Sequence, residues 1–441
     1  MNASSRAKRE ITRPWRRVAA VVLPTLSLAY AQLAAALPAF PGAEGFGTET
    51  PGGRGGVVMV VTNLNASGAG SFHDAMMATG PRIIVFRVSG VINQGDIFLD
   101  AAHSNVTVLG QSSPGGVTFT GSIGNYQTTF HDAIFRFIRI RAQAGDTIAF
   151  NPVYNLVIDH SDFSGGADET FDLDGSHDLT VQWSTITNSM SGSGSQNYGA
   201  LIAYRPTTNI SFHHNLYAHH GGRCGAQFHW DGSGSVPADG AKLDIRNNVI
   251  YNCGFQQIFR VDRPPSEGVK FNLIGNYAKS GPNTQSGSMI FGVGGTTYMS
   301  DNLYPGQSIG GSSTVAQPHP FPNVTTTSAT AAYDNVLNGV GAWPRDAMNT
   351  RTTNEVRTAT GTLGKLNDAL ILTGPAPPVD ADVDGIADAW ELTHGLNPAV
   401  RADSAQIHSS GYANIEVYLN ELADQILQQK RPNAPTAVSA N

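Results

Sequence analysis

One local pattern recurs along this chain and limits its fold more than any other feature. Each instance has a polar residue, three or four alternating apolar positions, then Asn, His or Ser, and another short apolar pair. Alternation with a period of two predicts strands with one buried face. Because the instances return at intervals of about 20 to 33 residues without helical patterns between them, they predict a solenoid of coils. The instances are NVTVLG at 105, FRFIRIRA at 135, NLVIDHSDFS at 155, DLTVQWSTIT at 178, NISFHHNLYA at 209, KLDIRNNVIYN at 242, VKFNLIGNYA at 269 and YMSDNLYP at 298.

The Asn that recurs at matching positions suits a turn that every coil repeats, because its side-chain amide can satisfy exposed backbone groups. A β-propeller would need four strands per repeat, and these repeats are too short for that. With 49 Gly among 441 residues and few helix formers, the composition also favours a turn-rich, all-β protein. We therefore predict a right-handed parallel β-helix with a small C-terminal appendage.

The N-terminus has the pattern of an export signal. Six basic residues precede the apolar run VAAVVLPTLSLAYAQLAAA, and cleavage is plausible after Ala31 or Ala36. A membrane anchor is the alternative, which Pro24 and the polar residues within the run disfavour. We expect residues 1–36 to be a signal peptide and the mature protein to be secreted, without a membrane anchor and as a monomer.

The mature chain would be acidic and poor in cysteine. Without residues 1–36 it has 21 Lys and Arg against 33 Asp and Glu, a net charge of −12. Such a protein should not bind nucleic acid or anionic membranes by bulk electrostatics, and a polyanionic substrate would need a local cation. Export permits a disulfide between Cys224 and Cys253, but free thiols are an equal alternative.

The repeating strand pattern ends before residue 340, and a Pro-rich stretch then leads into DADVDGIADAWE. This stretch has EF-hand ligand spacing, with Gly385 at the sharp turn and a Glu in twelfth place that can bind bidentately. The alternative is an acidic turn without a metal. We predict a β-helix over 37–345, a linker or wrap over 346–379, and a calcium loop with a C-terminal helix over 380–430. The predicted ligands are Asp380, Asp382, Asp384, Asp388 and Glu391, and the helix would pack against the body through Ile415, Tyr418, Leu419, Leu422 and Ile426.

A second acidic segment, NLVIDHSDFSGGADETFDLDG at 155–175, carries six carboxylates and no Lys or Arg. Packing carboxylates on neighbouring coils without basic partners is costly unless a cation fills the site. Oxygen ligands without a His or Cys pattern indicate a hard ion such as Ca²⁺.

The ordered motifs of the chain resemble those of the pectate lyase family, polysaccharide lyase family 1. The resemblance covers nearly the whole mature chain, and the Asp-rich loop with GYANIEVYLN resembles a tail of secreted bacterial members. It implies a parallel β-helix and calcium-assisted β-elimination of polygalacturonate or a related pectin-type polysaccharide. The motifs are FPGAEGFGTETPGGRGGVVMVVTNLNASGAGSFHDAM, GPRIIVFRVSGVI, NVTVLGQSSPGG, FIRIRA, GDTIAF, LVIDHSDFSGGADE, LTVQWSTI, HHNLYAHHGGR and RNNVIYNCG.

The resemblance also implies site residues. It places calcium ligands at Asp146, Asp168 and Asp172 and the catalytic base at Arg223, which follows HHNLYAHH. From the residues themselves, Glu169 is an additional candidate ligand, and a substrate-carboxylate clamp is the alternative role for Arg223. We interpret Asp159 with His160 as a structural pair, and Asp162 and Asp174 as solvated turn residues.

The chain departs from the family pattern at several basic positions. TNSMSGSG lacks the Lys that members often carry after the acidic pair, RCG replaces Arg-x-Pro, AQFHW contains no second Arg, and FSGGADE lacks a familiar Trp. We therefore expect Arg205, Arg260 or Arg263 to bind the substrate carboxylates. His219 and His220 flank Arg223 and are further candidates for substrate contact. His213 and His214 lie on a predicted strand, so their side chains should point to opposite faces and not share a metal.

Two rival functions remain open at this stage. A galacturonan hydrolase would need paired carboxylates, one of them protonated, and FDLDG supplies Asp172 and Asp174, although no other hydrolase motif is evident. A non-catalytic glycan-binding β-helix, such as an adhesin or degenerate lyase, is the second rival because basic residues are missing. The function that the sequence favours is a secreted, calcium-dependent pectate lyase.

Overall fold

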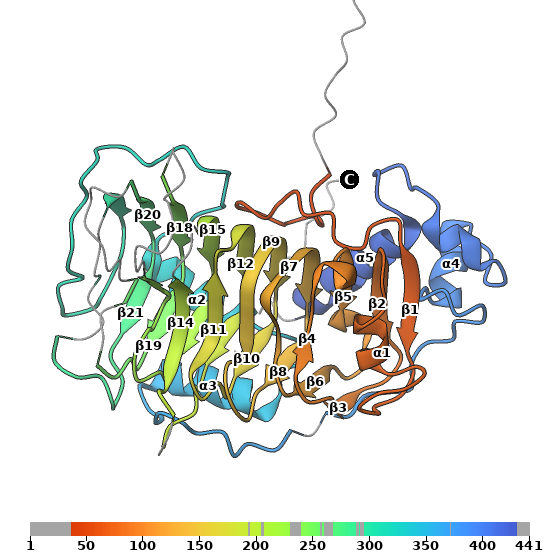
Figure 1. The fold of residues 1–441 in the computed structure, drawn as a ribbon, viewed down its shortest axis with the longest axis horizontal. Helices are drawn as coiled ribbons and strands as arrows, with labels where there is room; N and C mark the ends of the chain where they lie inside the picture. The colour runs from red at the N-terminus through yellow and green to blue at the C-terminus, as the bar shows by residue number, and fades with distance from the viewer. Residues whose placement is uncertain are drawn as a thin grey trace, which may run out of the picture. The chain divides into compact units, whose positions relative to one another are not determined.

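Parallel strands wind into successive coils and form a parallel β-helix (Figure 1), which confirms the predicted fold class. The computed structural model describes residues 37–192, 195–203, 207–229, 240–255, 258–259, 268–287, 291, 295–370 and 372–429. By its internal contacts the chain divides after Ala36, and every described residue belongs to the unit Leu37–Asn441. All the strand pairings within the two sheets are parallel, as a coil that returns to the same face requires.

The coils have three faces, and two long strands turn the corner between the first two. Face 1 consists of β4 (Ile97–Phe98), the first halves of β7 (Ile123–Arg136) and β9 (Ile148–Asp159), β11 (Glu169–Asp174), β14 (Tyr198–Ala203) and β17 (Gln227–His229). Face 2 consists of β1 (Val57–Val61), β2 (Arg82–Phe86), β5 (Val106–Leu109), the second halves of β7 and β9, β12 (His177–Gln182), β15 (Thr208–His213), β18 (Lys242–Arg246), β20 (Lys270–Ile274) and β22 (Thr296–Ser300). Face 3 consists of β3 (Gly90–Asn93), β6 (Val117–Thr120), β8 (Arg139–Arg141), β10 (Asp162–Ser164), β13 (Thr185–Thr187), β16 (Leu216–Ala218), β19 (Val249–Tyr251) and β21 (Tyr277–Lys279).

The turns between faces 2 and 3 carry the ladder of Asn side chains that the sequence predicts. The Nδ2 groups of Asn215, Asn248 and Asn276 each donate to the Oδ1 of the Asn on the next coil, at 3.1, 3.0 and 2.9 Å, ending at Asn302. Each amide also donates to a backbone carbonyl, as Asn248 does to Phe212 O at 2.8 Å. The ladder therefore satisfies buried backbone groups at the same corner of successive coils.

At this corner, the residue just before the ladder position has the left-handed backbone conformation that L-residues rarely adopt. Phe137, His160, Trp183 and His214 have φ of 55°, 44°, 49° and 56° at this position. Their rings stack in that order, with centroid separations of 5.1, 5.9 and 4.3 Å. Ring stacking along the solenoid therefore accompanies the unfavourable backbone conformation at this corner.

Helices cover two of the faces. Val336 and Leu337 of α2 (Ala329–Gly339) and Val356 of α3 (Ala347–Thr358) pack on β16 and β19 of face 3. On face 2, Ile415 and Leu419 of α5 (Asn414–Gln428) pack against β2 and β5, which confirms the predicted docking of the C-terminal helix. Helix α3 lies within the predicted linker range. The other helical elements among the described residues are α1 (Phe72–Met76), α4 (Asp388–His394) and the short 3₁₀ turns η1 (Ala101–His103), η2 (Gly110–Ser112) and η4 (Arg401–Ala405).

The segment that opens the described chain also lies on face 2. Gly47 N donates to Thr180 Oγ1 and Gly53 N donates to Thr107 Oγ1, both at 2.9 Å, and Phe40 packs with Ile134 and Val157. Because this segment and α5 cover face 2, and α2 with α3 cover face 3, the outward side chains of face 1 are the ones to examine for function. Among the described residues, no helix combines the length and apolar character needed to cross a membrane.

Candidate active site and C-terminal acidic site

Two adjacent coils of face 1 bring Asp146, Asp168 and Glu169 together. Asp146 precedes β9 and Glu169 opens β11, and Glu169 N donates to Asp146 Oδ1 at 2.8 Å. The backbone continues this pairing, because Thr147 N donates to Glu169 O at 3.2 Å. One carboxylate oxygen from each of the three acidic side chains lies within 4.8 Å of the others. The structure therefore brings together two of the predicted ligands and the additional candidate Glu169.

Asp172 lies on β11, directly beside Ala149 of β9, and adds negative charge to this group. Its Oδ1 atom is buried without a hydrogen-bond partner. Burial, together with Asp146, Asp174 and Asp168, raises the pKa of Asp172 to about 8. Burial and Asp168 likewise raise the pKa of Asp146 to about 7, although Arg223 opposes that shift. Carboxylates that crowd together this strongly fit a bound cation with oxygen ligands.

Arg223 lies two coils beyond β11, in the turn before β17. Its guanidinium forms an ion pair with Glu169 and lies over the ring of Tyr198, 4.3 Å from the ring centroid. Its backbone has φ of 50°, a left-handed conformation. The expectation that the acidic segment has no basic partner is therefore wrong for Glu169. Sequence spacing gives no signal for this pair, because Glu169 and Arg223 meet only through the stacking of the coils.

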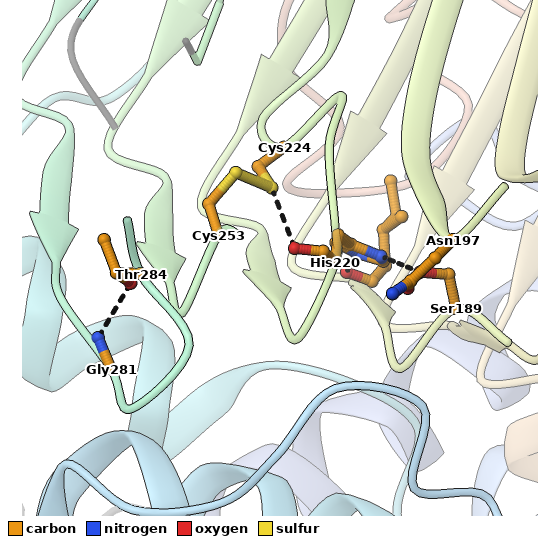
Figure 2. Close-up of a disulfide and its surroundings, with 8 residues drawn as sticks. Ser189, Asn197, His220, Cys224, Cys253, Gly281 and Thr284 are labelled. Atoms are coloured by element: carbon orange, nitrogen blue, oxygen red, sulfur yellow. Dashed lines mark hydrogen bonds between the residues drawn. A yellow bond between two sulfur atoms is a disulfide. The ribbon is translucent and has the colours of Figure 1, made fainter. Parts of the chain in front are cut away.

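A disulfide joins Cys224, the neighbour of Arg223, to Cys253 on the next coil, with a Cα–Cα distance of 6.0 Å. Figure 2 shows this disulfide beside His220, whose backbone oxygen lies 3.6 Å from Cys224 Sγ. His220 Nδ1 lies 2.9 Å from Ser189 Oγ, and Ser189 Oγ donates to Asn197 Oδ1 at 2.6 Å. The turn that carries Arg223 is thus held by the contacts of His220 before it and by the disulfide of Cys224 after it.

The two histidines before Arg223 do not reach solvent. His219 and His220 both have 0% exposed surface. His219 Nε2 lies 3.1 Å from Glu355 Oε2, and His220 Nε2 lies 2.8 Å from Ile186 O. Substrate contact, which the sequence suggests for them, does not agree with this placement, because both rings are fully buried and their nitrogens face Glu355 and Ile186 O.

The other acidic side chains of the segment at 155–175 are buried in the wall of the β-helix. Asp159 and His160 form the expected structural pair, with Oδ1 and Nδ1 2.8 Å apart. Asp162 and Asp174 are not solvated turn residues, because they lie on β10 and β11 and are 0% and 5% exposed.

The expectation that the side chains of His213 and His214 point to opposite faces is also wrong. Their Nδ1 atoms lie 3.0 Å apart, because β15 ends at His213 and His214 takes the left-handed conformation. Strand alternation therefore stops one residue too early to separate the two rings. The three arginines proposed for substrate carboxylates, Arg205, Arg260 and Arg263, lie outside the described residues.

A second acidic site occupies the predicted EF-hand-like loop. Oxygens of Asp380, Asp382 and Asp384 lie within 4.8 Å of one another, and so do those of Asp384, Glu391 and Asp403. Asp380 also pairs with Arg87 at 2.9 Å. Asp388, the ninth residue of the loop, is in neither group of the described chain, and its Oδ1 accepts from Ala381 N at 2.8 Å.

Unpartnered oxygens show that this loop, too, fits a cation. Both carboxylate oxygens of Asp382 and of Glu391 are buried without hydrogen bonds, as are Asp384 Oδ2 and Asp403 Oδ1. Burial and the neighbouring carboxylates raise the pKa of Glu391 to about 7. Asp403, which comes from η4, was missed because it lies twelve residues beyond the loop's last ligand, outside the spacing of the motif.

Comparison with known proteins identifies close relatives. A probable pectate lyase C of Neosartorya fischeri is 35% identical over 92% of this chain and 98% of its own. Proteins of the same name from Aspergillus fumigatus and Emericella nidulans are each 34% identical, over 92% and 88% of this chain and 98% and 94% of their own. No family model matches the sequence.

Comparison with solved structures finds the major allergen from cedar pollen, with a TM-score of 0.43 and 12% identity over 68% of this chain and 92% of that chain. A pectate lyase from Bacillus sp. N165 in complex with trigalacturonate has a TM-score of 0.41 and 16% identity over 68% of this chain and 99% of its own. The curated relatives, which match both chains almost end to end at more than 30% identity, decide the family. This chain belongs to the pectate lyase family and is a polysaccharide lyase.

Proposed function

We propose that this protein is a secreted, calcium-dependent pectate lyase that cleaves polygalacturonate by β-elimination, with Arg223 as the base. The observation that carries the proposal is the ion pair that brings Arg223, from two coils away, to a cluster of three carboxylates whose charge is only partly compensated. The names of the curated relatives support the same substrate.

Asp146, Asp168 and Asp172 would hold the calcium ion, with Glu169 as an additional ligand. When bound, calcium would neutralise the uronate carboxylate and so make the proton on the neighbouring carbon 5 more acidic. Arg223 would take that proton. The electron pair left on carbon 5 forms the double bond to carbon 4, the bond from carbon 4 to the glycosidic oxygen breaks, and the leaving oxygen takes a proton from water.

An arginine base needs help, because its ordinary pKa lies above about 12. Bound calcium would disfavour a second positive charge nearby, whereas the ion pair with Glu169 favours the charged guanidinium. The rate should therefore increase towards alkaline pH. We assign the binding of other uronate carboxylates to Arg205, Arg260 or Arg263.

Product chemistry tests the proposed reaction. Polygalacturonate incubated with the protein and calcium should give products that absorb in the near ultraviolet, because elimination leaves a double bond between carbons 4 and 5. New reducing ends without that absorbance would show a hydrolase, and binding without either product would show a non-catalytic glycan-binding protein. Either outcome would overturn the proposal.

We further propose that residues 1–36 are a signal peptide, and that the ranges 37–345, 346–379 and 380–430 are the β-helix, a wrap and the calcium-loop module of a secreted monomer. The basic N-terminus followed by an apolar run supports export. N-terminal sequencing of protein from the medium should start after Ala31 or Ala36.

The C-terminal loop would bind a second calcium with a structural role, through Asp380, Asp382, Asp384, Asp388, Glu391 and Asp403. Asp384 bonds to the backbone N of Ile386, which packs with Ile415 and Leu419 of α5. A metal at the loop would thus stabilise the docking of α5 on face 2 and leave the catalytic residues untouched.

Glu391→Gln should separate this structural role from catalysis. In calcium, the variant should melt several degrees below the wild type, because binding at 100 times Kd contributes about 2.7 kcal/mol of stability. In chelator, it should melt at the same temperature or higher, because one charge leaves a crowded group. Differential scanning calorimetry, with the exposed Asp424→Asn as control, checks both. A large fall in kcat without a change in Tm would contradict the structural role.

Calcium binding at the active site should strengthen with pH. The pKa values of Asp146 and Asp172, about 7 and about 8, lie above the ordinary value, so in the metal-free fold these groups hold protons that calcium must displace. Affinity should therefore rise from pH 6 and level off above about 8, with protons released on binding. Titration calorimetry of Glu391→Gln in two buffers of different ionisation enthalpy measures this. An affinity that is constant between about pH 6 and 8.5 would show that the carboxylates ionise before calcium arrives.

A further inference from the structure

Face 1 carries two large aromatic side chains that the proposed chemistry does not use. Phe98 of β4 is 66% exposed and Tyr126 of β7 is 68% exposed. Their strand neighbours Ile97 and Asn125 point inward, at 2% and 3% exposure, so the alternation of both strands turns the aromatic rings outward.

The pairing register places these rings in line with the acidic group. Phe98 pairs with Gly124, Gly124 pairs with Ala149, and Ala149 pairs with Asp172. Phe98 therefore lies in the same cross-strand row as Asp172, three strand spacings away, or about 14 Å at about 4.8 Å per spacing. Tyr126 follows Gly124 by two residues on the same face, diagonal to Phe98 and within reach of a large side chain.

Small residues separate the aromatic pair from the acidic group. Gly124 and Ala149 fill the row between them, so no large side chain of that row stands between Phe98 and Asp172. Gly124 has a structural reason to be glycine, since an added Cβ would lie 2.1 Å from Ala149 O. The close approach of β7 and β9 therefore explains why the row between Phe98 and Asp172 carries no large side chain at Gly124.

Single exposed apolar residues are common and need no explanation. Here two exposed aromatic residues hold diagonal positions on neighbouring strands of the face that the described helices leave uncovered, in register with the carboxylates. Aromatic faces bind sugars because the C–H groups of a pyranose ring offer apolar surface that can be buried on them.

We propose that Phe98 and Tyr126 form a sugar-stacking subsite that holds the polysaccharide chain about three strand spacings from Asp172, on the side away from Arg223. The proposal rests on the proposed function for its ligand, a galacturonan. The chain would run along the row from Asp172 over Ala149 and Gly124 to the aromatic pair. The subsite contributes affinity for long chains and does not take part in the bond-breaking step.

The double variant Phe98→Ala/Tyr126→Ala tests this subsite at saturating calcium. KM for polygalacturonate should rise about tenfold while kcat changes little, because the lost contact is remote from the reacting carbons. Kinetics on trigalacturonate should not change, since a trimer seated at the carboxylates is too short to extend over the aromatic pair. Phe98→Trp with Tyr126→Phe should keep the KM of the wild type. Val57→Ala, which truncates an equally exposed apolar side chain on β1 (66%), is the control.

An unchanged KM for polygalacturonate in the double variant overturns the subsite and leaves the proposed function standing. Equal losses on polymer and trimer also overturn it, because the effect would then lie at the carboxylates. If the wild type forms no unsaturated product, the proposed function fails, and affinity electrophoresis in polygalacturonate decides about the subsite. If polygalacturonate retards the wild type but not the double variant, the subsite is upheld. If it retards the wild type and the double variant equally, the subsite is overturned.

Discussion

Exhaustive chelation should abolish turnover of polygalacturonate, and added calcium should restore it. Asp146 and Asp172 lie in a group where burial and mutual repulsion already raise their pKa values, and Asp172 Oδ1 has no hydrogen-bond partner. Without a cation, these groups would take up protons and could not neutralise a substrate carboxylate. Several kcal/mol of transition-state stabilisation would be lost, which corresponds to a fall in kcat/KM of about 10²- to 10⁴-fold.

Asp172→Asn is the point variant that tests the same site. It keeps the size of the side chain but removes one charge and one strong ligand oxygen, so activity at limiting calcium should fall by at least about 10²-fold. Asp174→Asn is the matched control, because Asp174 lies two residues further on β11 and on the same side of the strand. Initial rates across a calcium titration, with Tm recorded for each variant, check the prediction.

Chelation would also remove calcium from the C-terminal loop, so its effects on the two sites must be distinguished. Glu391→Gln, whose calcium loop is impaired, should still lose all activity on chelation and regain it with calcium. Full activity of the wild type after exhaustive chelation would contradict the calcium mechanism. An equal loss in Asp172→Asn and Asp174→Asn would show that the charge of the strand matters rather than the ligand position.

The fold could be predicted because the coils repeat two local sequence features, the alternation of apolar and polar residues in a strand and a polar residue at the turn that follows. Strands such as β15 and β18 alternate in apolar and polar residues, and the Asn at the turn after each strand satisfies backbone groups of the preceding coil. Both signals are local in sequence. The C-terminal ligands within twelve residues and the apolar stripe of α5 were predictable for the same reason.

The features that were missed depend on distances that the sequence does not encode locally. Glu169 meets Arg223 across two coils, and Asp403 reaches the loop from η4. The contact of His213 with His214 depends on a strand that ends one residue earlier than alternation suggests. Asp162 looked like a turn residue, but in the fold it lies fully buried, and its Oδ2 is 3.4 Å from Nε of Arg139. Pattern predicts which residues face inward within a strand, whereas partners are set by the coil-to-coil register.

Arg223→Lys should lower kcat by about 10²- to 10⁴-fold, the usual contribution of general-base catalysis, with little change in KM. Lys keeps a cation at this position but moves it and loses the planar guanidinium that lies over Tyr198 and pairs with Glu169. Arg246→Lys is the matched control, since Arg246 pairs with Asp244 at 2.7 Å on face 2, away from the carboxylates. Steady-state kinetics at saturating calcium and alkaline pH compare the two variants. A raised KM with near-normal kcat in Arg223→Lys would make Arg223 a clamp for a substrate carboxylate.

Glu169→Gln tests the protonation of Arg223 itself. In the wild type, the carboxylate of Glu169 favours the charged guanidinium, which cannot accept a proton. Replacing it by a neutral amide removes that preference, so the neutral form becomes easier to reach. If Arg223 is the base, the pH at which kcat begins to rise should move to lower values in Glu169→Gln, measured over a pH series with calcium held saturating at each point. If Arg223 only binds a carboxylate, the charged form is the working one, and the profile should stay in place or move the other way.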